Sequence, residues 1–410
     1  MPVASTAAGY GCRVTTLPLF DIYRDLHAHP ELAFAEHRTA GVVADHLRSL
    51  GLEPTTGVGG TGVVAVLENA AGPVVWLRAD MDGLPVAERT GLAYASVHTA
   101  VDEDGSETRT MHACGHDLHM TWLLGALERL IATRDSWAGT VVAVFQPAEE
   151  VIGGARAMVD DDLVGRVPRP DVVLGQHTAP EPVGRVTVGS GPVMAASDRF
   201  TITFRGRGGH GSAPQTTRDP VVAAASAVVR LQSVVAREVG PRQAAVVTVG
   251  SIHGGTRANI IPDEVTIEVS TRAQTDDTRH QVEQAVRRIV AAESAAGGLE
   301  EPLVRVRPGA NVLVNDADAA GRVLAALEGV VPSLVAGDSV LGMASEDVGD
   351  LATAAEAPIV YWFTGTTDPA LFADGAEVPT NHSPFFAPLA EASIPVGVDA
   401  FVAATRAWLA

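Results

Sequence analysis

Lysine is absent from this sequence of 410 residues: every one of its 29 basic side chains belongs to arginine. The absence excludes several classes of catalyst. A phosphate-binding loop, a protein kinase, a Schiff-base enzyme and a serine–lysine hydrolase each need a lysine amine at the reacting centre. The chemistry that remains is that of carboxylates, imidazoles, hydroxyls and thiols.

Other scarcities narrow the class of protein further. The two cysteines, Cys12 and Cys114, are too few for a disulfide framework, so we expect a cytoplasmic protein. No apolar run reaches the roughly 18 residues of a membrane span, and Met1–Tyr10 lacks a basic segment followed by an apolar one, so no signal peptide is expected. The formal net charge of −20 argues against a nucleic-acid partner, because a polyanion binds a basic surface.

The richest stretch in the sequence is Met111–Met120, which holds three histidines, one cysteine and one aspartate in ten residues. A single glycine separates Cys114 from His116, so one sharp turn can direct both side chains to one centre. Thiolate and imidazole are both good ligands for zinc and related divalent ions. The amphipathic run Leu118–Arg134 predicts a helix directly after this turn.

Acids and histidines also follow four short apolar stretches that we predict to be buried strands, at 74–77, 141–145, 172–174 and 360–363. Open α/β sheets carry their chemistry at the carboxyl ends of strands. Taken alone, each of these side chains has an ordinary structural explanation, such as a solvated turn or a helix start. As a set they supply more ligands than one tetrahedral zinc needs, and the neighbouring Glu149 can serve as general base. The set therefore predicts a dinuclear hydrolytic site with the ligands Cys114, His116, Glu150, His177 and His382.

Three weaker patterns favour structure over function. His27 and His29 precede Pro30-Glu31, and we interpret this corner as the end of one helix and the start of the next, with metal binding as the alternative. Gly57–Gly62 resembles a dinucleotide fingerprint, but a strand follows it where a phosphate cradle needs a helix, so a hairpin turn is expected. The segment Ala100–Arg109 is expected to be a loop.

The sequence changes character after residue 191. Strands and helices are predicted in the order β-α-β-β-α-β, which is the ferredoxin-like arrangement. Metal-type residues stand on both sides of this segment, so it is predicted to be inserted into the catalytic domain. The fold class expected is α/β: a catalytic domain (1–191 and 310–410) with a mixed, mostly parallel sheet flanked by helices, plus an inserted α+β lid or dimerisation domain (192–309).

Together these motifs resemble the zinc aminoacylase/carboxypeptidase family, and most closely its branch of hippurate hydrolases and indole-acetyl-amino-acid hydrolases. Several ordered motifs with consistent spacing carry the resemblance: Arg24–Thr39, Arg78–Pro85, Met111–Met120, Gln146–Glu150, Gly175–His177, Gly208–Pro220, Asn259–Asp263 and Asn381–Phe386. The resemblance implies a metal-dependent amidohydrolase that cleaves a small N-acyl amino acid or a related amide.

The resemblance also implies a role for each matching residue. Cys114, His116, Glu150, His177 and His382 would bind two divalent ions, zinc or alternatively manganese or cobalt, and Glu149 would be the general acid/base. Asp80 and Asp82 would orient a ligand histidine. His210 would stabilise the oxyanion, often across a dimer, while Asn259 and Arg272 would grip the substrate carboxylate. A homodimer or homotetramer through the lid is expected. Gln215 departs from the branch, many members of which carry a second histidine there.

Two alternatives stay open at this point. One is a cysteine hydrolase in which Cys114 is the nucleophile, although it leaves Glu149, Glu150, His177 and His382 without a role. The other is a non-catalytic protein that binds metal or ligand on the same fold. Such a protein would need neither Glu149 nor His210.

Overall fold

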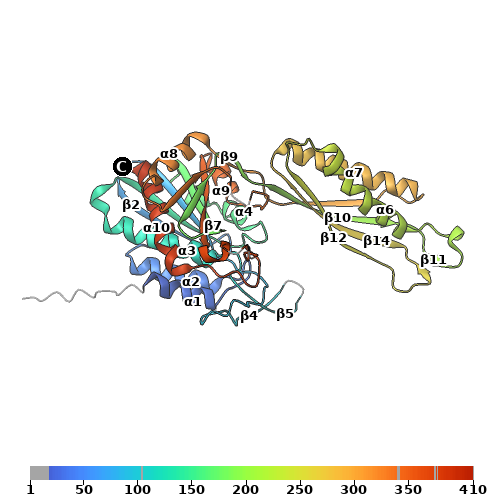
Figure 1. The fold of residues 1–410 in the computed structure, drawn as a ribbon, viewed down its shortest axis with the longest axis horizontal. Helices are drawn as coiled ribbons and strands as arrows, with labels where there is room; N and C mark the ends of the chain where they lie inside the picture. Colours follow the sequence, from blue (N-terminus) through green and yellow to red (C-terminus); the bar gives the residue numbers. More distant parts are fainter. Residues whose placement is uncertain (1–17, 103–104, 339–341, 374, 376, 410) are drawn as a thin grey trace, which may run out of the picture.

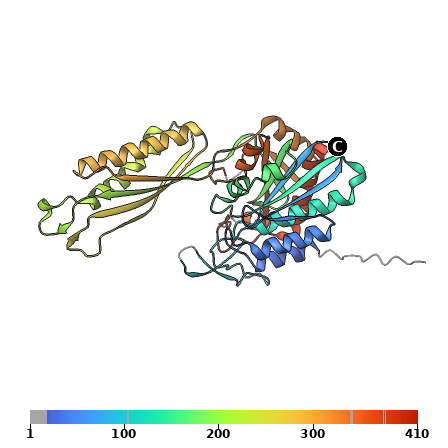
Figure 2. The same ribbon diagram turned by 180° about the vertical axis from the view of Figure 1, so that it is seen from behind.

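The chain forms two bodies that lie end to end (Figure 1). This computed structural model describes residues 18–102, 105–338, 342–373, 375 and 377–409, and Cys12 lies outside these ranges. The larger body holds both ends of the described chain, and the elongated body is built from the middle of the sequence (Figures 1 and 2).

An eight-stranded sheet forms the centre of the larger body, in the order β1-β2-β6-β3-β7-β18-β8-β17. The pairs β6–β3, β3–β7, β7–β18 and β8–β17 are parallel and the other three pairs are antiparallel, which confirms a mixed, mostly parallel sheet. The strands are β1 (Thr55–Val58), β2 (Gly62–Ala70), β3 (Val74–Asp80), β6 (Gly139–Gln146), β7 (Val172–Pro182), β8 (Arg185–Val188), β17 (Ser333–Ala336) and β18 (Ile359–Thr367).

Helices cover both faces of this sheet, which explains why its central strands read as continuous apolar runs. In β6, Val141, Ala143 and Phe145 pack on one face, while Val142 and Val144 pack on the other. The first face is covered by α1 (Leu19–Ala28), α2 (His37–Ser49), α3 (His116–Ala132), α8 (Ala317–Leu327) and α10 (Ala390–Leu409). The second is covered by α4 (Gly154–Asp160), α5 (Leu163–Arg166) and α9 (Gly349–Ala355).

The elongated body is a four-stranded antiparallel sheet in the order β12-β14-β10-β15, with two helices on one face (Figure 1). We call it the lid. Its elements follow the predicted β-α-β-β-α-β order: β10 (Ala196–Arg205), α6 (Pro220–Ser233), β12 (Ala245–Gly254), β14 (Glu264–Ala273), α7 (Asp276–Ala296) and β15 (Leu303–Pro308). Phe200, Ile202 and Phe204 alternate towards the helices, so the opposite face of the sheet carries no helix.

Small pairings complete the fold. Two-stranded ribbons join β9 (Gly191–Met194) to β16 (Leu313–Asn315), β11 (Gly209–His210) to β13 (Ile260–Ile261), and β4 (Thr99–Val101) to β5 (Glu107–Arg109). Figure 1 places β11 at the end of the lid that lies far from the larger body.

Among the described residues, Pro220–Glu238 is the one helix that could cross a membrane by length and composition, but its Ala223, Ala227 and Leu231 pack in the core of the lid.

Several boundaries differ from those predicted. The strand expected at 172–174 continues as β7 to Pro182, so His177 lies inside a strand and not just past its end. Likewise β3 extends to Asp80, and part of the expected loop 100–109 is the hairpin β4–β5. The helix α6 ends at Ser233 and is followed by a π-helical turn, Val234–Glu238. In the strands, hydrogen bonds to a neighbouring strand extend the element beyond its apolar residues.

The interpretations of Gly57–Gly62 and of the corner at His29–Glu31 are confirmed. Gly57–Gly62 is the turn between antiparallel β1 and β2. His29 ends α1, and the carboxylate of Glu31 accepts the backbone N–H groups of Arg38 and Thr39 in the first turn of α2. His27 has a role that the sequence did not reveal: it is buried, with Nδ1 2.7 Å from Asp117 and Nε2 3.1 Å from Glu88.

His27 provides a test of how α1 is attached to α3. Burial lowers the pKa of His27, but its hydrogen bonds to Asp117 and Glu88 outweigh burial and raise that pKa to about 9. A raised pKa in the folded state stabilises the fold fully below the unfolded value of about 6.5. This contribution is lost as the pH rises through about 9.

We therefore expect the wild-type free energy of unfolding to fall between pH 6.5 and 9 by up to about 3 kcal/mol on account of this one group. His27→Gln should remove that part of the pH dependence, and the exposed His37→Gln should leave it in place. Urea unfolding at several pH values measures the difference. Identical pH profiles for His27→Gln and wild type would contradict the assignment.

Candidate metal centre and its pocket

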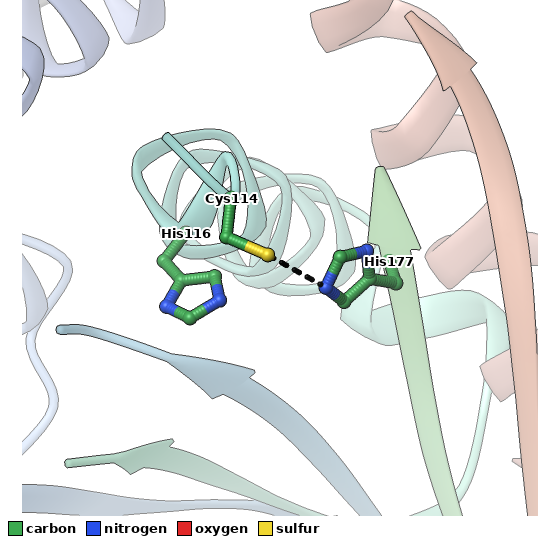
Figure 3. Close-up of side chains that lie close together, drawn as sticks. All are labelled: Cys114, His116 and His177. Carbon is green, nitrogen blue, oxygen red and sulfur yellow. Dashed lines mark hydrogen bonds between the residues drawn. The ribbon is translucent and has the colours of Figure 1, made fainter. Parts of the chain in front are cut away.

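The turn Cys114-Gly115-His116 directs a thiol and an imidazole to the same point at the start of α3 (Figure 3). Gly115 has φ +85°, a conformation that L side chains rarely adopt. A Cβ at this position would also lie 2.7 Å from Thr178 Oγ1 on β7. The turn therefore needs glycine both for its backbone conformation and for its close approach to β7.

His177 on β7 completes the first group of donors, as Figure 3 shows. Its Nε2 lies 3.5 Å from Cys114 Sγ, and its Nδ1 lies 2.6 Å from the backbone oxygen of Thr178. Because a carbonyl oxygen can only accept, Nδ1 donates, and Nε2 is left with its lone pair facing the sulfur. This is the tautomer that binds a metal through Nε2.

His116 is held in the corresponding way by Asp82, whose Oδ1 lies 3.2 Å from His116 Nδ1. The other nitrogen, Nε2, is buried without a hydrogen bond and lies 3.8 Å from an oxygen of Glu149 and 3.8 Å from one of Glu150. Oε1 of Glu150 is likewise buried without a partner. A buried unpaired donor or acceptor costs about 1–3 kcal/mol, so these atoms mark a position for a ligand.

The loop that presents the glutamates is tightly constrained. Ala148 and Ile152, on either side of the pair, have φ of 51° and 52°, which is uncommon for residues other than glycine. The buried Glu36 accepts the N–H of Ala148 at 2.8 Å, and Asp82 accepts the N–H of Glu150 at 2.9 Å. Asp82 therefore orients a histidine and a glutamate together.

His382 approaches from a loop near the end of the sequence. Its backbone N–H donates to Ala113 at 2.8 Å, with φ of 68°, and its Nε2 lies 3.3 Å from Glu150 Oε2. Asn381 donates to the backbone oxygen of Cys114 at 3.2 Å. The fold thus gathers the five predicted ligands, together with the predicted base Glu149, into overlapping groups, each within 4.8 Å: Cys114, His116 and His177; Cys114, Glu150 and His382; His116, Glu149 and Glu150.

The electrostatics of this cluster fit cations. Burial lowers the pKa of His116, but Asp80, Asp82 and Glu150 outweigh burial and raise it to about 10. Burial together with the nearby Asp82 and Asp80 raises the pKa of Glu150 to about 8, although His116 opposes the change. Burial and the charges of Glu150 and Glu149 also raise the pKa of the Cys114 thiol. The negative charge concentrated here is of the kind that divalent ions neutralise.

Glu149 differs from Glu150 in its surroundings. It is buried, and burial with the neighbouring carboxylates of Glu346, Glu150 and Asp347 raises its pKa well above the usual range. A carboxylate with a raised pKa accepts a proton readily near neutral pH. Glu149 also lines a pocket of about 300 Å³ that contains Cys114, Glu150, His177 and His382.

The lid residues predicted to bind substrate lie in two different places. Arg272 on β14 lines the same pocket as the metal-type residues. His210 belongs to β11 at the far end of the lid, and Asn259 lies beside it, because its backbone oxygen accepts the N–H of Gly211 at 2.8 Å. One chain therefore does not bring Asn259 and Arg272 together, nor His210 to the donors around His116.

Two groups at the site were missed from the sequence. The ring of His119 is fully engaged: Nδ1 lies 2.5 Å from Asp80 Oδ1, and Nε2 accepts the N–H of Thr178 at 2.8 Å. Asp80 lies 3.7 Å from His116 Nε2, so its direct hydrogen bond goes to His119.

The second group centres on Arg78, which is buried within β3. A charge inside an otherwise apolar strand was the signal in the sequence that could have found it.

Arg78 joins three carboxylates behind the donor cluster. Its guanidinium lies 2.7 Å from Asp80, 2.7 Å from Glu346 and 3.5 Å from Asp347. Glu346 also accepts the hydroxyl of Tyr361 at 2.6 Å, and Asp347 accepts Gln146 Nε2 at 2.6 Å. These hydrogen bonds occupy Glu346 and Asp347, so the pair supports the floor of the site.

The fold and the donor set define a metal-dependent hydrolase, because buried thiol, imidazole and carboxylate groups converge beside a glutamate suited to proton transfer. The chain belongs to peptidase family M20/M25/M40, whose family model matches residues 76–407. This confirms the resemblance to the aminoacylase/carboxypeptidase family and identifies the chain as a metal-dependent amidohydrolase of that family.

Individual relatives agree with this family membership. The N-acetyl-L-cysteine deacetylase of Bacillus subtilis (strain 168) is 39% identical over 300 residues, which cover 73% of this chain and 69% of the relative. The hippurate hydrolase of Campylobacter jejuni is 41% identical over 281 residues, 68% of this chain and 70% of the relative. A Bacillus subtilis structure described as a dinuclear metal binding peptidase from the M20 family matches with a TM-score of 0.76 and 29% identity, covering 94% of this chain and 96% of that one.

Arg78 gives a stability test of the site's floor. Arg78→Met removes the cation from three buried carboxylates, and we expect a loss of about 3–5 kcal/mol in the free energy of unfolding. Arg205→Met breaks an exposed ion pair with Glu264 and should cost less than about 1 kcal/mol. Chemical denaturation of both variants measures the two values. Equal and small losses would show that Arg78 does not hold the cluster together.

Proposed function

We propose that this protein hydrolyses the amide bond of N-acyl amino acids, or of closely related small amides, with two divalent metal ions and Glu149 as general base. The observation that carries the proposal is that Glu149 and Glu150, with its unpaired Oε1, line one pocket with Arg272, while the unpaired Nε2 of His116 lies 3.8 Å from each glutamate. The relatives that hydrolyse an N-acetyl amino acid derivative and hippurate support the substrate class.

The residues present fit two metal ions. Cys114, His116, Glu150, His177 and His382 would hold them, with zinc expected and manganese or cobalt as alternatives. When bound, such ions polarise an amide carbonyl and lower the pKa of water towards neutrality. Asp82 orients His116, and the backbone oxygen of Thr178 orients His177, so neither ring needs to turn on binding.

The protein's own groups then move the proton and hold the substrate. Glu149 accepts a proton from the attacking water and returns it to the leaving amine, a task suited to its raised pKa. Arg272, on the lid side of the pocket, binds the carboxylate of the amino acid through its planar guanidinium. Closure of the lid would exclude water from this reaction.

A single chain lacks an oxyanion donor at this pocket if His210 has that role, since His210 lies at the far end of the lid. We therefore propose a homodimer through the lid, with a homotetramer as its extension, in which each chain supplies His210 and Asn259 to the other chain's site. The edge strand β12 and the exposed Val222 and Val229 of α6 offer a surface for a second copy. We also propose that the protein is cytoplasmic and that its substrate is a small molecule.

The cysteine-hydrolase alternative fits the site less well. Nucleophilic cysteines have a lowered pKa beside positive groups, whereas burial, Glu150 and Glu149 raise the pKa of Cys114. A non-catalytic binding protein would have no use for Glu149, which is buried among other carboxylates at a cost in stability.

The first test separates metal binding from chemistry. Wild-type protein should contain about two divalent ions per chain and release amine from N-acyl amino acids, and a chelator should abolish that release reversibly. Glu149→Gln should keep its metal but lose turnover by about 10²–10⁴-fold. Glu128→Gln is the matched control, because Glu128 lies on α3 but does not line the pocket.

Full activity in metal-free protein would contradict the metal-dependent mechanism and assign Cys114 as the nucleophile. Normal turnover in Glu149→Gln would remove Glu149 from the proton transfer.

Mixing two inactive variants tests the shared site. Glu149→Gln and His210→Ala chains, each inactive alone, should regain activity when unfolded together and refolded as mixed dimers. Random pairing makes half of the dimers mixed, and each mixed dimer has one complete site, so about a quarter of wild-type activity is expected. No recovery, in a sample shown to be dimeric by light scattering, would place His210 outside the partner's site.

A further inference from the structure

The pocket has two walls of different charge. The larger body supplies the thiol, imidazoles and glutamates of the donor cluster, while the lid supplies three arginines, Arg199, Arg272 and Arg307. The proposed function accounts for Arg272 through the single carboxylate of an N-acyl amino acid. Nothing in it accounts for Arg199 and Arg307.

Strand register shows that the three arginines share one face of the lid sheet. Arg199 on β10 lies directly opposite Arg307 on β15, and on its other side opposite Ser270 on β14. Arg272 is two residues from Ser270, so it points the same way. Residues directly opposite each other across two strands have Cβ atoms about 5 Å apart. The next pair along these strands, Phe200 and Val269, packs against the helices. Because side chains alternate along a strand, the arginines lie on the helix-free face.

These arginines have no carboxylate partner among the described residues. Arg272 donates to Ser270 Oγ and to the backbone oxygen of Thr271, both neutral acceptors. No hydrogen bond or ion pair engages the side chains of Arg199 and Arg307 within the described ranges. The nearby Asp198 is already bound at 2.6 and 2.8 Å by Arg279.

Three neighbouring positive charges without anions are unusual in a chain with a formal net charge of −20. Like charges directly opposite each other destabilise a sheet, and a cationic patch inside a pocket attracts anionic ligands. Burial, together with the charge of Arg199, lowers the pKa of Arg272. The arrangement therefore costs stability in the free protein, and a bound anion would relieve that cost.

We infer that Arg199 and Arg307 form a second anion-binding subsite, and that the preferred substrate is an N-acyl amino acid that carries two carboxylates. The inference rests on the proposed function for the first carboxylate, which Arg272 binds. Arginine forks recognise carboxylates through paired hydrogen bonds. The second carboxylate belongs either to the amino-acid side chain or to the acyl group. In a pocket of this size, either part of the substrate can reach Arg199 and Arg307.

Matched substrate pairs test this subsite on the full-length, metal-loaded protein. N-acetyl-L-glutamate against N-acetyl-L-glutamine places the second carboxylate on the amino acid. N-succinyl-L-leucine against N-succinamoyl-L-leucine places it on the acyl group. We expect the charged member of at least one pair to have a kcat/KM about tenfold or more above that of its neutral partner.

Variants then assign the preference to residues. The double variant Arg199→Gln/Arg307→Gln should reduce the charged-to-neutral ratio to about 1, because the second carboxylate then lacks a cation. Arg305→Gln is the matched control, since Arg305 is exposed on the same strand but does not line the pocket. It should keep the wild-type ratio. Equal rates on both members of both pairs, or a preference that survives the double variant, would overturn the inference.

Binding without turnover separates this inference from the proposed function. Calorimetry with metal-loaded Glu149→Gln should show tighter binding of the charged member, and the added double variant should abolish that difference. If wild type hydrolyses none of these amides but still shows this arginine-dependent binding, the proposed function fails and the subsite stands. If the neutral amides are hydrolysed and no arginine-dependent difference is seen, the subsite fails and the proposed function stands.

Discussion

The structure depends on a concentration of negative charge that the chain itself neutralises only in part. Asp80, Asp82, Glu149, Glu150, Glu346 and Asp347 gather at one edge of the main sheet, and Arg78 is the buried cation placed against three of them. Charges buried in this way are tolerated only with hydrogen bonds and opposite charge. At the rear of the cluster, Arg78 pairs with Asp80, Glu346 and Asp347, so these carboxylates have partners. At the front, His116 and Glu150 each have a buried polar atom without a hydrogen-bond partner. That asymmetry separates the supporting part of the site from the part proposed to bind metal.

Backbone geometry holds the front of the site in place before any ligand arrives. Gly115 turns tightly against Thr178, and Ala148, Ile152 and His382 have positive φ angles. Hydrogen bonds to neighbouring segments fix two of these conformations: the N–H of Ala148 donates to Glu36, and the N–H of His382 donates to the backbone oxygen of Ala113. Strain of this kind, held by the surrounding fold, is a way to position groups precisely enough for catalysis.

The two bodies contribute different kinds of side chain to one pocket. The donor cluster belongs wholly to the larger body, with its helix-covered sheet, whereas the arginines that line the same pocket come from the helix-free face of the lid. A substrate between them would contact both, so its binding energy can contribute to bringing the bodies together. His210 on β11 and Asn259 beside it lie at the far end of the lid, which is why the proposed dimer assigns them to the other chain's site.

The sequence by itself determined the donor types, the Cys114-Gly115-His116 turn, the order of elements in the lid and the mixed main sheet, because these follow from local spacing and apolar periodicity. The tertiary structure decided what depends on distant partners. Hydrogen bonding across β7 and β18 placed His177 inside a strand, and Glu346 with Asp347, far along the chain, made a charge at Arg78 tolerable in the core. The family resemblance also paired Asn259 with Arg272, but Arg272 on β14 lines the pocket while Asn259 lies beside Gly211 next to β11, at the other end of the lid. An extended strand advances about 3.3 Å per residue, so residues near its two ends lie far apart in space. Only the fold shows which end of the strand reaches the pocket.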